Sequence, residues 1–183
     1  MKLQTSTSLQ IIYLSLVGAL MLSCKEQAPK VQPAAAPAAL AASEQAQEAG
    51  IAFREASAQG AFTSYLALKD ALVASDASAA AAAAKEMQGH LSAAEGELAT
   101  ALTSLANTAD LNVQRSLFSD LGAALEPVFQ EHLSSGTVYK QFCPMAFNNQ
   151  GGYWFSDSET IRNPYFGDAM LSCGKVDTAL KAL

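Results

Sequence analysis

The sequence predicts a mainly α-helical domain, an up-down-up bundle of three or four helices with a small C-terminal β-hairpin and an irregular loop containing cysteine and methionine. Two observations lead to this fold class. From residue 61 to 133, apolar side chains recur at spacings of three and four residues, which places them on one face of a helix. From residue 137 onward, β-branched, aromatic, Asn, Pro and Gly residues favour short strands and turns instead.

The first 23 residues are typical of a targeting segment. The apolar run Ile11–Leu22 is shorter than a membrane-spanning helix, and the small residue Ser23 follows it, directly before Cys24. Residues 1–23 are therefore predicted to be a bacterial lipoprotein signal peptide, with Cys24 as the lipidated residue. An ordinary signal peptide followed by an incidental cysteine is the alternative. Both interpretations predict export to a compartment where thiols tend to oxidise. The lipoprotein interpretation adds an anchor on the periplasmic or cell-surface face of a bacterial membrane.

Residues 24–43 are expected to form a tether, and residues 44–183 a helical domain that ends in a Cys/Met motif. Ala, Pro and Gln dominate the tether, and three prolines within nine residues favour an extended, solvated chain. The tether would hold the domain away from the membrane.

Two helices are expected before residue 75. A short one over residues 43–59 would have Ser43 as its cap and Ile51 and Phe53 as its apolar anchors. A stronger pattern covers residues 61–73, where apolar side chains recur at helical spacing. These are Phe62, Tyr65, Leu66, Leu68, Leu72 and Val73.

Two longer helices are expected next. Residues 77–105 are predicted to form one helix, which its two glycines weaken without ending it. Residues 111–133 are predicted to form the third amphipathic helix of the bundle. Pro127 lies inside this pattern, removes one backbone donor and clashes with the preceding turn, so a kink or a break is expected near residues 123–126.

The C-terminal third is predicted to be largely non-helical. Residues 137–142 and 153–155 are expected to pair as a hairpin across the turn-rich stretch 148–152. Residues 161–174 are too rich in Asn, Pro and Gly for regular structure. Residues 175–183 are expected to close the chain as one or two helical turns.

Composition and motifs exclude several classes of function. The chain has 11 Lys and Arg against 17 Asp and Glu, and no basic cluster that could neutralise phosphates, so nucleic acid is not expected as a partner. No arrangement of Ser, His and Asp, no phosphate-binding glycine loop and no carboxylate pair is recognisable. The chain is therefore not expected to be an enzyme.

Two Cys-plus-Met pairs are the candidates for a metal site. Cys143 and Met145 are two positions apart around a proline, and Met170 and Cys173 are three positions apart before a glycine. If the loop folds back, four sulfur ligands converge, and thiolate with thioether is a soft set that selects Cu(I). The alternative is a disulfide between the two cysteines, which are about thirty residues apart. Such a disulfide stabilises a fold by roughly 3 to 4 kcal/mol in the chain-entropy model. The residues alone leave both alternatives open.

Several segments resemble the DUF3347 family over roughly residues 61–176. They are Tyr65–Val73, Gln114-Arg115 with Phe118, Phe142–Met145, Tyr153–Ser156 and Ile161–Gly167 with Met170 and Cys173-Gly174. Members of this family occur as exported or lipid-anchored small proteins and as a domain on periplasmic adaptor subunits of copper and silver efflux systems. The resemblance implies a helical domain with a copper-linked role. It also implies that the metal ligands are Cys143, Met145, Met170 and Cys173.

One departure from the family pattern lies on the helix expected over residues 111–133. Many relatives have a His directly before the Gln-Arg pair and often another nearby, where this chain has Val113 and Leu117. A metal site here would then consist of sulfur alone. The expected function is that of an exported, lipid-anchored protein that binds or buffers Cu(I) for a metal-efflux adaptor or a copper acceptor protein. The alternative is a structural or protein-interaction module whose cysteine pair is a plain disulfide.

Overall fold

The structure, a computed structural model, describes residues 50–94 and 96–182. The predicted signal peptide, the lipidated Cys24, the tether and residues 43–49 of the first expected helix lie outside the described residues. In the part that is described, no helix is both long enough and apolar enough to cross a membrane. The described chain is mostly helical with small antiparallel sheets, as the sequence predicts.

The first described element is a strand, so the prediction of a helix over residues 43–59 is wrong for residues 50–55. Strand β1 (Ala52–Phe53) pairs antiparallel with β2 (Leu133–Ser135). The extended backbone lets the Phe53 ring reach into the core, with its centroid 5.1 Å from that of Phe62. Helix α1 (Ala56–Val73) begins directly after this strand. The burial of one aromatic ring therefore outweighs a weak helical preference.

The long helix predicted over residues 77–105 is two helices, α2 (Ala77–His90) and α3 (Gly96–Asn107). Gly96 has a φ of +66°, a left-handed conformation that glycine adopts at little cost. A straight helix over this range would be about 42 Å long and would carry its C-terminal leucines beyond the core. The turn folds the chain back instead, and both Leu102 and Leu105 are buried.

Helix α4 (Leu111–His132) confirms the third predicted helix. The Asp110 side chain caps it by accepting from the backbone N–H groups of Asn112 and Val113. Pro127 lies inside the helix, which continues through it, so the predicted break does not occur. The neighbouring Leu125 and Phe129 side chains are fully buried, and their packing offsets the one lost backbone hydrogen bond.

The C-terminal sheet contains the predicted hairpin and one strand more. Strands β3 (Thr137–Cys143) and β4 (Gly152–Ser156) pair antiparallel, and β5 (Lys175–Lys181) pairs with the other edge of β3 in the order β4-β3-β5. The prediction of helical turns over residues 175–183 is therefore wrong for residues 175–182. Strand β5 satisfies the outer backbone groups of β3 and buries Leu180 opposite Val138, which an isolated helical turn would not do.

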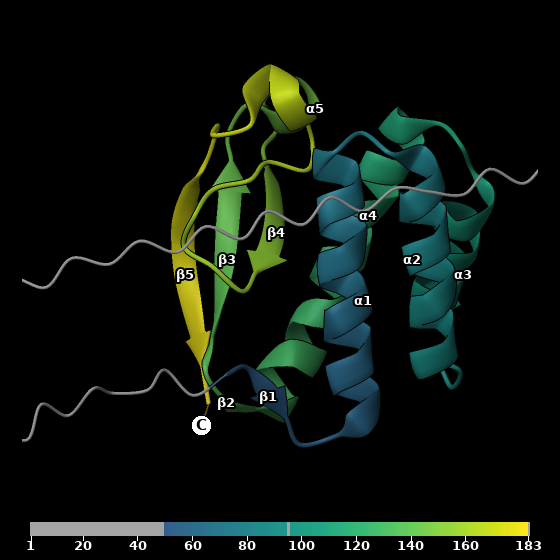
Figure 1. Ribbon diagram of the computed structural model, residues 1–183, viewed down its shortest axis with the longest axis vertical. Coiled ribbons are helices and arrows are strands. Elements are labelled where there is room, and N and C mark those ends of the chain that lie inside the picture. Colours follow the sequence, from purple (N-terminus) through teal and green to yellow (C-terminus); the bar gives the residue numbers. More distant parts are fainter. Residues whose placement is uncertain (1–49, 95, 183) are drawn as a thin grey trace, which may run out of the picture. The chain divides into compact units, whose positions relative to one another are not determined.

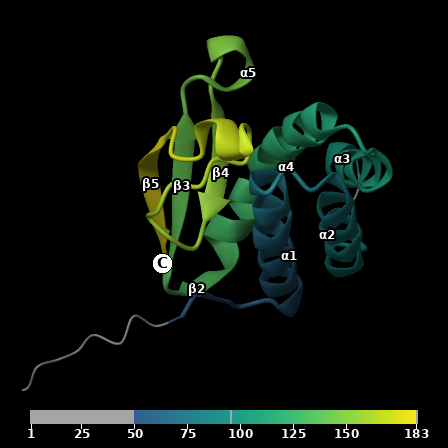
Figure 2. The same cartoon turned by 45° about the horizontal axis from the view of Figure 1, so that its top comes forward.

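Two short segments connect these strands. The segment labelled α5 (Ala146–Asn149) has left-handed backbone at Phe147 and Asn148, and η1 (Gly167–Met170) is a single 3-10 turn. Figure 2 shows α5 and the yellow η1 turn at the same end of the sheet. The irregular stretch predicted over residues 161–174 thus folds beside the tip of the hairpin.

The helices cover one face of the sheet in two layers. In Figure 1, α1 and α4 lie between the sheet and the outer pair α2 and α3, and α4 packs directly against β4. Aromatic rings fill the space between the sheet and helices α1 and α4. The ring centroids of Tyr65 and Phe118 are 4.8 Å apart, and the Tyr65 hydroxyl accepts the backbone N–H of Phe155 at 3.3 Å. This aromatic layer holds the sheet against the helices, and with it the end of the sheet where β3 ends and β5 begins, which we call the sulfur-containing end.

Candidate functional site

The two cysteines meet where β3 ends and β5 begins. Cys143 is the last residue of β3, and Cys173 lies two residues before β5. Phe142 pairs with Lys175 across these strands, so the register brings both cysteines to one end of the sheet. Their Sγ atoms are 3.2 Å apart, both are free thiols, and Cys143 is buried whereas Cys173 is half-buried.

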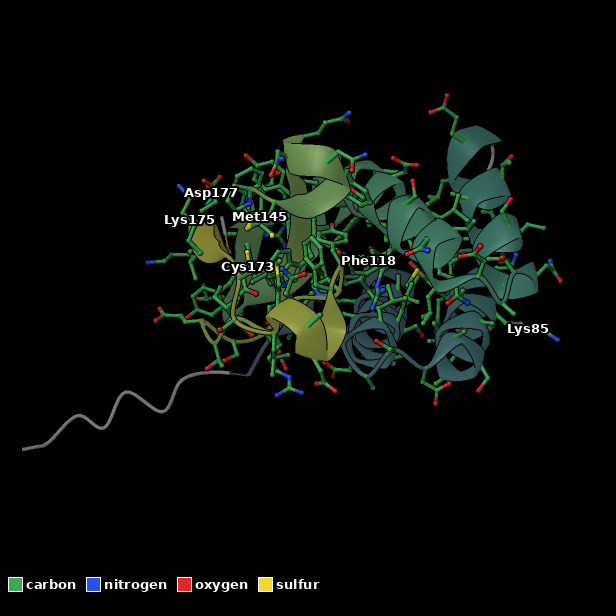
Figure 3. All side chains as sticks on the ribbon, turned by 90° about the horizontal axis from the view of Figure 1, so that it is seen from above. Lys85, Phe118, Met145, Cys173, Lys175 and Asp177 are labelled. Atoms are coloured by element: carbon green, nitrogen blue, oxygen red, sulfur yellow. The ribbon has the colours of Figure 1, made fainter. Side chains whose placement is uncertain are left out.

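The two candidate methionines line one groove at this end. Met145 is 46% exposed and Met170 is 36% exposed, although methionine side chains are usually buried. The groove has a volume of about 570 Å³. The other residues that line it are Asn112, Arg115, Phe147, Asn148, Asn149, Tyr165 and Phe166. Figure 3 looks down on this end of the fold, with Met145, Cys173 and Lys175 labelled over the sheet.

The described part of the chain has no cluster of His, Cys, Asp and Glu side chains that could form a metal site of another kind. Within residues 50–94 and 96–182, no three side chains of His, Cys, Asp or Glu gather closely enough to hold a metal ion. Val113 of α4 is 44% exposed, whereas Leu117 packs partly against the core. A metal held at this end of the sheet would depend on the two thiols and the two thioethers.

Asn163 holds the loop that carries Met170 and Cys173. This side chain is fully buried; its Nδ2 donates to the Cys173 carbonyl at 2.7 Å, and its Oδ1 accepts the Tyr165 N–H at 2.8 Å. The backbone N–H of Cys173 in turn donates to the Met170 carbonyl at 3.0 Å, which closes the turn between the two sulfur residues. Asn163 is thus a positioning residue rather than a metal ligand. The Asn163-Pro164 pair is the feature of the sequence that indicates a constrained loop here.

Arg115 of α4 ties the same loop to the helices. Its Nε donates to the Pro164 carbonyl at 2.9 Å, and its Nη2 donates to Ser75 Oγ at 3.0 Å. Gly167 lies against this contact with a φ of +57°, and a Cβ there would come within 2.7 Å of Ser75 Oγ. The loop can dock this closely only because residue 167 is glycine. In the sequence, Arg115 and Gly167 stand out only as parts of a family motif, because their contacts span 40 residues or more.

Aromatic rings form the inner wall beside the cysteines. Tyr165 packs on Gly152, the partner of Cys143 in the β3–β4 register, and its hydroxyl donates to the Tyr153 carbonyl. Burial raises the pKa of Tyr165, so the hydroxyl keeps its proton for this bond. Trp154, fully buried, stands edge-on to Tyr165 at 5.8 Å. This wall shields the buried Cys143 from water.

The paired thiols influence each other's acidity. The hydrogen bond with Cys143 raises the pKa of the Cys173 thiol, and burial and the negative charge of a Cys143 thiolate raise it further. The two groups therefore favour a state in which one sulfur keeps a proton that it shares with the other. A soft metal ion would displace that proton.

Alkylation should report this raised pKa directly. In the reduced full chain, the reaction of Cys173 with iodoacetamide is expected to be several-fold slower at pH 7.5 than that of an unstructured cysteine, because only the thiolate reacts. The rate should keep rising with pH above the ordinary thiol pKa of about 8.5. Peptide mass spectrometry across a pH series measures it. In the control variant Cys143→Ser, Cys173 should react faster at pH 7.5; a wild-type plateau near pH 8.5 would contradict the expectation.

Comparison with known proteins identifies part of the chain. No curated protein and no solved structure matches it. One family, described as "Protein of unknown function (DUF3347)", matches residues 61–136, from within α1 to the residue before β3. The match starts where the resemblance predicted and ends before Cys143, so the four sulfur residues lie outside it. Residues 61–136 of this chain thus match the DUF3347 family.

Proposed function

We propose that this chain is an exported, lipid-anchored protein that binds or buffers Cu(I) through Cys143, Cys173, Met145 and Met170, in association with metal efflux or homeostasis. The observation that carries the proposal is the 3.2 Å separation of Cys143 Sγ and Cys173 Sγ at the end of the sheet where both methionines line one groove. These four sulfur atoms come from two chain segments that the sheet and the Asn163 contacts hold together. The lipid anchor would be attached at Cys24.

The geometry of the cysteine pair suits a shared soft ion. For a metal–thiolate bond of about 2.3 Å, two sulfur atoms on one tetrahedral ion lie about 3.8 Å apart. Cys143 and Cys173 would need to separate by roughly half an ångström to accept it. Cys173 lies beside a glycine and is half-buried, so it is the sulfur with room to move. Two thiolates supply most of the affinity, and the thioethers add neutral donors that hard divalent ions bind poorly.

The partner in this proposal is a protein that gives or takes Cu(I). The sulfur-containing end is formed by loops rather than by the helix bundle, so another protein could approach it without displacing a core element. A metal-efflux adaptor or a copper acceptor protein would be such a partner, and the membrane anchor would keep the two close together.

A second candidate function follows from the same pair of cysteines. Sγ atoms at 3.2 Å need to approach by only about 1.1 Å to form a disulfide of ordinary length, about 2.05 Å. In that case Cys143–Cys173 would be a structural bond, and the domain would be a protein-interaction module without metal.

Competition for Cu(I) distinguishes the two candidates. The reduced full chain is expected to take Cu(I) from a chromogenic Cu(I) chelator at least 100-fold more tightly than the Cys143→Ser/Cys173→Ser variant, because that variant lacks both thiolates. The control Cys24→Ser removes the cysteine sulfur outside the pair and should bind like the wild type. Equal affinity of the wild type and the double variant would refute the copper proposal. A protein isolated fully oxidised and resistant to mild reductant would favour the disulfide module.

A further inference from the structure

The methionine groove and the cysteine pair are not equally accessible. We propose that Met145 and Met170 form an outer subsite that receives Cu(I) first, and that the ion then moves inward to Cys143 and Cys173. This inference rests on the proposed function and adds an order to it, in which thioethers capture the ion and thiolates retain it.

Exposure separates the two pairs of sulfur residues. Met145 and Met170 are 46% and 36% exposed and both line the groove, whereas Cys143 is fully buried, Cys173 is half-buried, and neither cysteine belongs to the groove lining. An ion that enters through the groove therefore meets thioether sulfur before thiolate sulfur. The chain links the two pairs closely, because Met145 follows Cys143 by two positions and Met170 precedes Cys173 by three.

The exposure of these methionines is imposed by the local backbone. Met145 directly precedes a segment in which Phe147 and Asn148 have φ values of 52° and 56°, a left-handed turn that keeps the chain at the tip of the hairpin. Met170 is the last residue of the η1 turn, and the hydrogen bond from the Cys173 N–H to its carbonyl closes the turn that follows. Met87, by contrast, is fully buried in the core. Two separate segments thus present a methionine to one groove.

The groove contains few groups that would retain a cation strongly. Its polar lining consists of the amides Asn112, Asn148 and Asn149, the guanidinium of Arg115 and the hydroxyl-bearing Tyr165, with no carboxylate and no imidazole. Hard divalent ions find no charged oxygen ligand there, and the positive charge of Arg115 disfavours any free cation. Two neutral thioethers would therefore hold a soft ion weakly, which suits a site that must pass the ion on.

Silver provides a redox-inert probe of the outer subsite. In the Cys143→Ser/Cys173→Ser variant of the full chain, labelled with [13C-methyl]methionine, Ag(I) should shift the methyl resonances of Met145 and Met170 together, with saturation at one equivalent. The Met87 resonance should stay in place and serves as an internal reference. Shifts at neither exposed methionine, or equal shifts at Met87, would overturn the inference.

Loading kinetics test the order in a chain with both cysteines intact. Transfer of Cu(I) from a chelator to the reduced Met145→Leu/Met170→Leu variant should be at least tenfold slower than to the wild type. Met87→Leu, a similar change in the core, should stay within twofold of the wild type. If the two methionines only complete the final site, the release rate rises and the loading rate is unchanged, and the inference fails. Failure of the wild type to bind Cu(I) would instead refute the proposed function.

Discussion

Replacing Asn163 with alanine should lower the free energy of unfolding by about 3 kcal/mol. The side chain is fully buried and makes two hydrogen bonds, to the Cys173 carbonyl at 2.7 Å and from the Tyr165 N–H at 2.8 Å. Alanine lacks the amide that makes both hydrogen bonds. The Cys173 carbonyl and the Tyr165 N–H are then left unsatisfied, at a cost of about 1 to 3 kcal/mol each. Urea denaturation of the reduced protein measures the change through its midpoint.

Asn107 provides a matched control for this substitution. Its Nδ2 also donates to a backbone carbonyl, that of Thr103, at 2.7 Å, but the side chain is exposed. Water replaces that hydrogen bond, so Asn107→Ala should cost less than about 0.5 kcal/mol. Equal midpoints for the two variants would show that Asn163 does not hold the loop. A large loss at Asn163 alone would support the assignment of a positioning role.

Local patterns predicted the helices better than the strands. The helical spacing of apolar residues in 61–73 and 111–133 correctly predicted α1 and α4, because each helix buries its apolar face against the same core. Strand β5 could not be found this way, since only Leu180 among its residues is buried. Its conformation is decided by the free edge of β3, which lies more than 30 residues earlier in the sequence. The same holds for β1, whose partner β2 is about 80 residues away.

The meeting of the two cysteines was predictable from the sequence, and the arrangement around them was not. The prediction brought Cys143 and Cys173 together as a metal site or a disulfide, and the structure places their sulfur atoms 3.2 Å apart. The separation into a thiol pair, of which Cys143 is buried and Cys173 half-buried, and a more exposed thioether pair depends on which way each turn faces. Left-handed backbone at Phe147 and the hydrogen bonds of Asn163 decide that, and neither has a signature in spacing.

Replacing Phe129 with alanine should have the largest effect on stability, about 4 kcal/mol. Its ring lies within 6 Å, between centroids, of four others, Phe53 of β1, Phe62 and Tyr65 of α1, and Phe155 of β4. It is therefore the ring that joins helix α4 to the sheet and to the first strand. Truncation of a buried phenylalanine costs about 3 to 5 kcal/mol, because the transfer free energy is lost and a cavity remains. Urea denaturation again gives the value.

Phe129→Ala should also raise the rate at which the buried Cys143 thiol is alkylated. Cys143 is inaccessible in the folded chain, so its alkylation requires unfolding, and about 4 kcal/mol corresponds to a rise of nearly three orders of magnitude in the unfolded population. Tyr153→Ala is the matched control, because this ring is 41% exposed and stacks mainly on Phe142, at 4.5 Å. It should cost about 1 kcal/mol and change the alkylation rate less than tenfold. If Cys143 in Phe129→Ala reacted no faster than in Tyr153→Ala, the sulfur-containing end would not depend on the aromatic layer for its protection.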